Sequence, residues 1–419
     1  MAKTQSIISN LDESKNISMN RNFISLHEIP YDYSIDKRML NIENKVRSNL
    51  LSWNGQFSPQ LIELLLENYA YENSIVFDPF LGSGTLIIEA ARKNIEAYGT
   101  EINPAAYHLS NIYNFCKYSY SERKQIIEYF EKSVLTSTDY DDAFLQPNQL
   151  NEEDLIGYLI EKSKSEIKFE HLILIRGLVI LIDSYKNGTN NELIRKYWDN
   201  LKNLIRNLPY TKKNINIFND DARSVVIEKD LIDLVITSPP YINVFNYHQQ
   251  YRASAELLGE KVLVAARSEI GSNRKHRSNR FLTVIQYIYD MYSTFLHLKQ
   301  LCKKNARIIF IVGRESNVRK TNYYNSKIIA SVAKISGLDI ICRQERVFTN
   351  RFGKSIYEDL LHFTNKKEDV GNNRRILEDL ALEVLLNSLG RAPEESKQDI
   401  NEAISSITKV HESPIFTKE

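Results

Sequence analysis

The sequence predicts an α/β protein with a mainly parallel sheet, a terminal antiparallel hairpin, a helical insertion and a helical C-terminal tail. Short β-branched runs alternate with helical patterns from residue 60 to residue 114, and the alternation resumes at residue 215. Such alternation is typical of parallel strands joined by crossover helices. The 419 residues include only 14 glycines and 10 prolines, which favours long helices with few tight turns.

The first block of the sheet is predicted between residues 60 and 114. QLIELLLENY (60–69) has helical spacing and follows Ser58 and Pro59, a pair typical of a helix start. SIVFDPF (74–80) predicts a strand, which ends in the glycine-rich turn LGSG. A helix is then predicted at TLIIEAARKN, a strand at EAYGTEIN and a helix at PAAYHLSNIYNF.

The alternation stops between about residues 118 and 213, where long segments of helical spacing predict an insertion. The sheet resumes with INIFNDDA (215–222) and LIDLVITSPPY (231–241). Then follow a helix around 247–258, a polar loop at 268–279, a helix at 283–302 and a strand at 306–313. DIICRQERVF and SIYEDLLHF predict the terminal hairpin, and the helical tail begins at Asn372.

These boundaries divide the chain into five predicted parts. The first, residues 1–45, is polar and aperiodic, so we expect a loosely packed N-terminal arm. The others are a first core block (46–117), the helical insertion (118–213), a second core block (214–366) and the tail (367–419).

Composition excludes several classes of protein. The formal net charge is +1, so the overall charge predicts no partner. Cys116, Cys302 and Cys342 lie far apart without a CxxC pair, which disfavours disulfide frameworks and thiolate metal sites, and we expect no metal. No segment resembles a signal peptide or reaches the roughly 18 apolar residues of a membrane span, so we expect a cytoplasmic chain.

Charge is nevertheless distributed unevenly along the chain. Residues 267–354 hold 18 Lys and Arg against 5 Asp and Glu, a local net charge of 18 − 5 = +13. Like charges repel one another unless a polyanion compensates them, so this segment predicts contact with nucleic acid. Phosphate contacts are expected from the basic loop residues Arg267, Arg274, Lys275, Arg277 and Arg280.

The first motif is FDPFLGSGT (77–85). Gly82 and Gly84 permit close approach of the backbone to a ligand at the carboxyl end of a strand, where open α/β sheets bind ligands. Asp78 opens this turn, and Glu101 ends the next strand, at the spacing of an acid that accepts ribose hydroxyls. Asp221 ends a third strand and is positioned to accept an adenine amino group; the alternative is that these acids cap helices or turns.

The second motif is TSPPY (237–241). Pro239 and Pro240 have no amide N–H, so the backbone there presents only carbonyl acceptors. Ser238 adds a hydroxyl acceptor and Tyr241 a planar face. Acceptors beside a stacking surface suit an exocyclic amino group on a flat heterocycle.

Together, DPFLGSGT and TSPPY resemble the S-adenosylmethionine-dependent DNA amino-methyltransferases, and the serine-type tetrapeptide resembles the N4-cytosine group. WNGQFSP (53–59) resembles the segment that closes over the methionine end of the cofactor. The resemblance implies a Rossmann-like class I methyltransferase fold with S-adenosyl-L-methionine as cofactor. It implies cofactor contacts from Phe57, Ser58, Pro59, Asp78, Phe80, Gly82, Gly84, Thr85, Glu101 and Asp221, and contacts to the target base from Ser238, Pro239, Pro240 and Tyr241.

The expected reaction is methylation of cytosine N4 in duplex DNA after the base is flipped out of the helix. Tyr241 is expected to stack on the base, with Tyr247 or Phe245 as the opposite wall, and His248 is interpreted as a helix-surface residue. C5 methylation is rejected because no cysteine follows a proline. A cognate restriction endonuclease or defence component is a further expected partner.

Several alternatives stay open. They are N6-adenine as the target, an RNA or tRNA guanine-N2 methyltransferase, and a non-catalytic nucleic-acid-binding scaffold. TSPPY follows DPFLGSGT in this chain, whereas many N4-cytosine enzymes have the reverse order. Either the insertion, with Trp198, or the basic segment 267–354 is therefore the candidate for reading DNA sequence.

Overall fold

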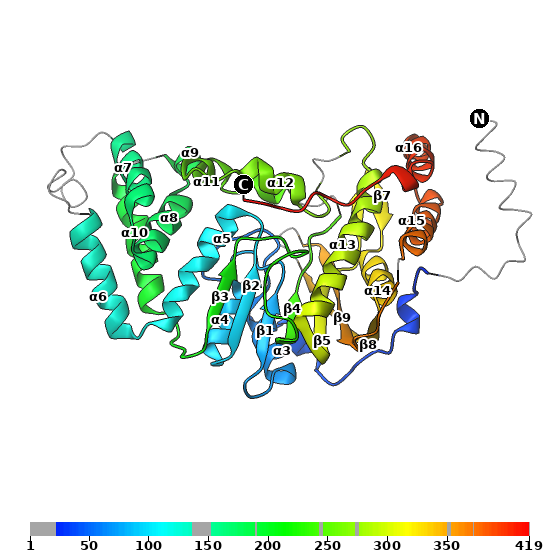
Figure 1. The fold of residues 1–419 in the computed structure, drawn as a ribbon, viewed down its shortest axis with the longest axis horizontal. Helices are drawn as coiled ribbons and strands as arrows, with labels where there is room; N and C mark the ends of the chain where they lie inside the picture. Colours follow the sequence, from blue (N-terminus) through cyan, green and yellow to red (C-terminus); the bar gives the residue numbers. More distant parts are fainter. Residues whose placement is uncertain are drawn as a thin grey trace, which may run out of the picture.

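The computed structural model describes residues 22–135, 152–188, 191–242, 246–272, 276–349, 353–371 and 373–418. Its centre is a seven-stranded sheet of order β3-β2-β1-β4-β5-β9-β8 (Figure 1). The strands are β1 (Ile75–Asp78), β2 (Glu96–Thr100), β3 (Ile215–Phe218), β4 (Ile232–Thr237), β5 (Cys302–Gly313), β8 (Leu338–Thr349) and β9 (Ser355–Asn365). β1 to β5 pair in parallel, and β9 and β8 add the antiparallel hairpin that the sequence predicts.

The first core block forms as predicted because local signals set its boundaries. Ser58 is the N-cap residue of α3 (Pro59–Tyr69), with Pro59 as the first helical residue. The glycine turn leads from β1 into α4 (Thr85–Arg92). The Asn103 side chain accepts hydrogen bonds from two N–H groups at the start of α5 (Pro104–Asn111), which η2 (Ile112–Lys117) extends.

Between η2 and β3 the described helices form a group at one end of the molecule (Figure 1). They are α6 (Tyr120–Phe130), η3 (Glu131–Leu135), α7 (Glu152–Ser165), α8 (Phe169–Ile182), α9 (Ser184–Asn187) and α10 (Asn191–Arg206). Trp198 is only 4% exposed, and its indole N–H donates to Glu131 at 2.9 Å. This tryptophan therefore belongs to the interior of the insertion.

The second core block contains elements that the sequence did not predict. As expected, a helix, α11 (Arg252–Leu257), follows the 3₁₀ turn η5 (Tyr247–Gln249), and α13 (Leu282–Leu301) precedes β5. An unpredicted helix, α12 (Val262–Ser268), lies between α11 and the predicted polar loop. A small hairpin, β6 (Ser316–Val318) with β7 (Thr321–Tyr323), and α14 (Asn325–Ile335) lie between β5 and β8.

The described part of the N-terminal arm is packed, which corrects the expectation of a loose arm. Its elements are η1 (Leu26–Glu28) and α2 (Lys37–Asn41). Ile24, Leu26 and Ile29 are buried, and the backbone around Tyr31 pairs with Arg343 of β8. Ile35 and Leu40 are buried as well. These apolar contacts and the backbone pairing hold the segment, and they leave no periodic pattern in the sequence.

The tail is helical only in part. It contains α15 (Arg374–Leu389), α16 (Glu394–Ile404) and η6 (Ile407–Lys409). Residues 410–418, which we call the C-terminal strap, then run extended across the molecule towards α12, as the red end of the ribbon in Figure 1 shows.

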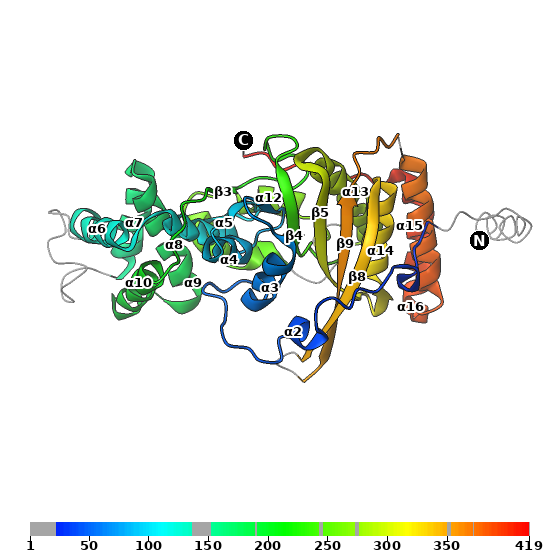
Figure 2. The ribbon, with the colours of Figure 1, turned by 90° about the horizontal axis from the view of Figure 1, so that it is seen from below.

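Apolar side chains of the strands alternate between two cores, one on each face of the sheet. Val76, Leu234 and Ile309 join α3, α4, α5 and the insertion, whereas Phe77 and Val235 join α13, α14 and the tail helices. Figure 2 shows the strands between the insertion helices at one end and α15 and α16 at the other.

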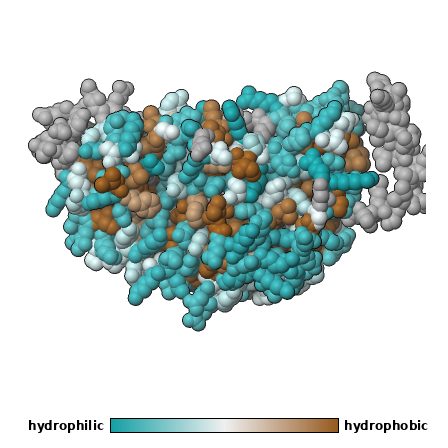
Figure 3. All heavy atoms as spheres, in the orientation of Figure 1, coloured by the Kyte–Doolittle hydropathy of each residue, from teal (hydrophilic) through white to brown (hydrophobic). Residues whose placement is uncertain are grey.

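On the face seen in Figure 3, hydrophilic residues separate the apolar patches. None of the described helices combines the length and apolarity that crossing a membrane requires.

Candidate active site

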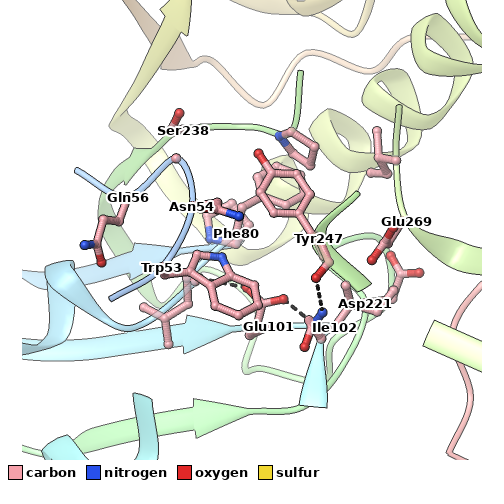
Figure 4. A pocket seen from close by; sticks show the side chains of 18 of the residues that line it. Trp53, Asn54, Gln56, Phe80, Glu101, Ile102, Asp221, Ser238, Tyr247 and Glu269 are labelled. Atoms are coloured by element: carbon pink, nitrogen blue, oxygen red, sulfur yellow. Dashed lines mark hydrogen bonds between the residues drawn. The ribbon is translucent and has the colours of Figure 1, made fainter. Parts of the chain in front are cut away.

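A cleft of about 830 Å³ opens at the carboxyl ends of β1, β2, β3 and β4. The turns after these strands meet there because parallel strands all end at the same edge of the sheet. Ser238 lies at one side of the cleft, and Asp221 and Glu269 lie at the opposite side (Figure 4). The segment Trp53–Phe57 lines the same cleft, and the Trp53 ring stacks on Tyr247 with 6.5 Å between centroids.

The two glycines of the first motif are required by the turn itself. Gly82 has a φ of +54°, and a Cβ there would lie 3.0 Å from the Trp53 ring. Gly84 has a φ of +92°, and a Cβ there would lie 2.8 Å from the Tyr113 ring. Gly82 therefore leaves room on the cleft side, whereas Gly84 allows the turn to pack on the core behind it.

Asp78 is fully buried at the end of β1, behind the cleft-lining residues Pro79 and Phe80. Its Oδ1 accepts hydrogen bonds from the Phe80 N–H at 3.0 Å and from the Thr237 hydroxyl at 2.6 Å. Its Oδ2 has no hydrogen-bond partner among the described residues. Burial raises the pKa of Asp78 to about 7, against these two hydrogen bonds. Thr237 thus joins the two motifs, a link that sequence reasoning missed.

Glu101 lies in the cleft at the end of β2 and is 9% exposed. One carboxylate oxygen accepts the Gly82 N–H and the other accepts the Asn103 N–H, both at 2.7 Å. Burial raises the pKa of Glu101 to about 7, and the nearby carboxyl groups of Asp78 and Glu269 add to the rise. Each oxygen keeps a second lone pair, so the group can still accept a hydrogen bond from a ligand.

Asp221 also lines the cleft, but its carboxylate is already engaged. Arg223 donates to Asp221 from Nε at 2.8 Å and from Nη2 at 2.6 Å, and the Phe416 N–H donates to Oδ2 at 3.1 Å. The neighbouring Asp220 lines the same cleft, and burial raises its pKa. The structure therefore offers Asp220, one residue earlier, as the more available acceptor.

The TSPPY segment continues directly from β4. Ser238 borders the cleft and Pro240 lines it, whereas Pro239 is buried. The Ser238 hydroxyl lies 3.2 Å from the Tyr241 hydroxyl. A Cβ on Gly313 would lie 3.4 Å from the Tyr241 ring, so this ring packs against the end of β5. Tyr241 is not among the residues that line the cleft, where Tyr247 is the tyrosine in contact.

The structure thus brings most of the predicted site together. The predicted residues that line the cleft are Phe57, Phe80, Gly82, Thr85, Glu101, Asp221, Ser238 and Pro240. The predicted residues outside its lining are Ser58, Pro59, Asp78, Gly84, Pro239 and Tyr241. Arg274, Lys275 and Phe245 lie outside the described residues, and Arg267 and Arg277 are exposed while Arg280 is half-buried.

The interpretation of His248 as a surface residue is wrong. It is 2% exposed, and its Nδ1 lies 3.0 Å from a carboxylate oxygen of Glu269. Sequence reasoning also missed Ile102, Asn103 and Glu269 as cleft residues. Ile102 and Asn103 directly follow Glu101, the acid at the end of its strand, and this position in the sequence could have identified them as cleft residues.

The basic segment does not form one uniformly charged face. Several of its cations are neutralised by carboxylates from other parts of the chain: Lys303 by Asp233, Arg314 by Asp359, Arg319 by Asp399, and Lys320 by Glu395. Counting charges along the sequence therefore overestimated the excess that a nucleic acid would meet. In the described part of the chain, no group of three or more His, Cys, Asp or Glu side chains is arranged to hold a metal ion.

Comparison with known proteins identifies similar DNA methyltransferases. The family model N6_N4_Mtase, described as DNA methylase, matches residues 33–112. Type II methyltransferase M.MjaII from Methanocaldococcus jannaschii is 21% identical, over 79% of this chain and 83% of that relative. Type II methyltransferase M.AvaI from Nostoc sp. is 20% identical, and the match covers 60% of this chain and 62% of that relative.

Among solved structures, a SAM-dependent methyltransferase from Methanosarcina mazei aligns with 72% of this chain and 96% of its own length. It is 10% identical with a TM-score of 0.33, a likeness that carries no conclusion about function. The family model and the two relatives support the predicted resemblance of this chain to the DNA amino-methyltransferases, a family that uses S-adenosylmethionine as methyl donor.

Proposed function

We propose that this protein methylates the exocyclic N4 amine of cytosine in duplex DNA, with the target base flipped out of the helix. The observation that carries the proposal is the position of Ser238, which borders both the cleft and a second groove beyond it. An amine held at Ser238 from the groove side would face whatever the cleft binds. An enzyme must extrude a base from the duplex to place its amine in such a position.

The residues that line the cleft, together with the buried Asp78 next to Pro79, fit S-adenosylmethionine. The Oδ2 of Asp78, which has no partner among the described residues, would accept a hydrogen bond from the methionine ammonium group. Glu101 would accept hydrogen bonds from the ribose hydroxyls through its remaining lone pairs. Asp220, in place of the expected Asp221, would accept the adenine amino group, with Phe80 and Ile102 as apolar neighbours.

The chain's own part in the reaction is orientation. The cytosine amine is a poor nucleophile because its lone pair is delocalised into the ring. The Ser238 hydroxyl and the Pro239 carbonyl would accept the two N–H bonds and direct the lone pair along the line of attack. S-adenosylmethionine, when bound, supplies an electrophilic methyl group: a C–N bond forms, the C–S bond breaks, and the amine releases one proton. Tyr241 would position the Ser238 hydroxyl at 3.2 Å instead of stacking on the base.

Replacing Ser238 by alanine should lower methyl transfer by about tenfold or more, because the amine loses one of its two acceptors. Affinity for S-adenosylmethionine should stay unchanged, since the hydroxyl holds the amine. Tritium transfer to duplex DNA measures the first quantity and calorimetry the second. Ser405→Ala, an exposed serine at the end of α16, is the matched control. Normal methylation by Ser238→Ala would rule out this role.

Duplex DNA is the proposed substrate, and Arg267 and Arg277 are its proposed phosphate contacts because both are exposed. Replacing both by alanine should weaken binding to all duplexes alike. The slope of log K against log[salt] should fall by up to about 1.8, or about 0.9 for each phosphate that is no longer neutralised. Lys320→Ala is the matched control, since Glu395 already neutralises this lysine. An unchanged slope would remove both arginines from the interface.

Sequencing the modified bases of DNA from cells that express the protein distinguishes cytosine N4 from adenine N6. The two relatives named above are type II methyltransferases, which supports a restriction endonuclease as the functional partner of this chain.

Exchanging residues 118–213 with those of a relative of different specificity tests whether the insertion reads the DNA sequence. A chimera that keeps its original site assigns that role to the basic segment.

A further inference from the structure

A second groove begins where the cleft ends, at Ser238. Residues 55–57 and Ser238 border both cavities, so the groove and the cleft share a wall. The rest of the groove is lined by the N-terminal segment around Ile42, by Ile311 of β5, by residues 346–349 of β8 and by Glu358 of β9. A ligand in this groove that reached Ser238 would therefore lie next to the cofactor cleft.

One wall of the groove holds a buried arginine, Arg346, that has few hydrogen-bond acceptors near its guanidinium. Arg346 is 6% exposed, and its Nε has no hydrogen-bond partner among the described residues. Its nearest carboxylate is Glu358, at 3.5 Å, which is too long for a hydrogen bond of normal strength. Its guanidinium lies over the Phe348 ring, 4.7 Å from the ring centroid.

Two nearby arginines, in contrast, have hydrogen-bond partners for their guanidinium groups. Arg314 donates to both oxygens of Asp359 and also pairs with Glu345. Arg343, on the same strand as Arg346, donates to the Leu26 carbonyl at 3.1 Å. A buried guanidinium without such bonds is costly unless acceptors arrive from outside the protein. Arg346 therefore points to a ligand that carries hydrogen-bond acceptors.

The register of the sheet connects this arginine with the TSPPY segment. Arg346 of β8 pairs with Glu358 of β9, which in turn pairs with Gly313 at the end of β5. The Tyr241 ring packs on Gly313, and the Tyr241 hydroxyl lies 3.2 Å from Ser238. Residues paired across three strands therefore connect the Arg346 guanidinium with Ser238, the serine that is proposed to hold the amine.

We propose that Arg346 reads the target base by donating two hydrogen bonds to O2 and N3 of the flipped cytosine, and that Glu358 positions the guanidinium. This inference rests on the proposed function. Cytosine has these two acceptors side by side next to its amine, and a planar guanidinium matches two adjacent acceptors. On its Watson–Crick edge, adenine has one acceptor, N1, next to its amine, and a C–H where cytosine has O2. The arginine would therefore select cytosine over adenine.

The test uses the full-length protein and duplexes that contain its methylation site, identified first by sequencing modified DNA from expressing cells. The target position carries either cytosine or 3-deazacytosine, which keeps O2 and the amine but lacks the N3 acceptor. Wild-type protein should methylate the analogue at least tenfold less efficiently, measured as kcat/KM. Arg346→Met keeps an unbranched side chain without donors, and it should lose at least tenfold on cytosine. Removing N3 should then cost this variant less than about threefold.

Two controls separate this reading role from folding and from the cofactor site. Arg346→Lys retains one charged donor group and should recover only part of the loss if two adjacent acceptors are read. Arg375→Ala, an exposed residue of α15, should behave as wild type. Melting temperature and S-adenosylmethionine affinity should be the same in all variants.

The possible results are distinct. Loss in Arg346→Met together with a collapsed analogue effect supports the inference. A full analogue effect in Arg346→Met, or normal activity of this variant on cytosine, overturns the inference and leaves the proposed function standing. Methylation of adenine alone by the wild-type protein overturns the proposed target base, and the reading of cytosine by Arg346 with it.

Discussion

Replacing Arg223 by methionine should destabilise the protein by about 3–5 kcal/mol, the range for removing one partner from a buried ion pair. Arg223 pairs with Asp221 at 2.6 Å and with Asp290 at 2.9 Å, and all three side chains are at least 98% buried. It also donates to the carbonyls of Ser413 and Pro414 in the C-terminal strap, at 2.8 and 2.9 Å. The substitution leaves two carboxylates in the interior without their cation.

Urea unfolding measures this loss as a lower midpoint at an unchanged slope. The triple variant with Asp221→Asn and Asp290→Asn should recover much of the stability, because it leaves no unpaired charge. Arg252→Met is the control, since its exposed pair with Glu256 should contribute about 1 kcal/mol or less. A cost for Arg223→Met no larger than for Arg252→Met would show that the strap is not held by this network.

Replacing Asp78 by asparagine should weaken S-adenosylmethionine binding roughly 10- to 150-fold, the equivalent of one charge-assisted hydrogen bond of about 1.5–3 kcal/mol. The same change should stabilise the ligand-free protein at pH 8. Burial raises the pKa of Asp78 to about 7, so above that pH the wild type holds a buried negative charge, and one of its oxygens accepts no hydrogen bond from the described residues. Asparagine keeps the shape of the side chain without this charge.

The pH dependence follows from the direction of the shift. The pKa of Asp78 in the unfolded chain is about 3.9, so between about pH 4 and pH 7 the folded state binds more protons than the unfolded state. The contribution of Asp78 to stability is therefore greatest at low pH and declines as the pH rises through this window. Glu101, whose pKa is also raised to about 7 by burial, adds to the same trend.

Thermal melts with and without S-adenosylmethionine test both statements. Without ligand, Asp78→Asn should melt about 2 °C or more above wild type at pH 8, and the gap should narrow towards pH 5. With ligand, the wild type should gain more stability than the variant, because only its carboxylate meets the ammonium group. Asp78→Asn with undiminished affinity, or with a lower melting temperature at pH 8, would remove the proposed role of Oδ2.

Much of the core was predictable from the sequence because the rules that shape it act over a few residues. Alternating apolar side chains mark the strands, and Ser58 with Pro59 marks the start of α3. Gly82 and Gly84 stand where φ is positive, and two prolines leave only acceptors after Ser238. These signals were sufficient to predict the parallel strands that carry the two motifs, the terminal hairpin and the family resemblance. The resemblance is confirmed.

Only the tertiary structure decided which polar groups remain available. Asp221 and Asp220 are neighbours in the sequence, yet Arg223 and the backbone of Phe416 occupy the first and not the second. Arg343 and Arg346 lie on the same strand, yet Arg343 donates to the Leu26 carbonyl of the N-terminal segment, whereas Arg346 faces Glu358 at 3.5 Å. Hydrogen bonds and ion pairs between residues nearly 200 positions apart depend on how the whole chain packs, and packing leaves no periodic pattern along the sequence. The sequence therefore determined which chemical groups reach the site, and long-range packing determined which of them stay free to bind.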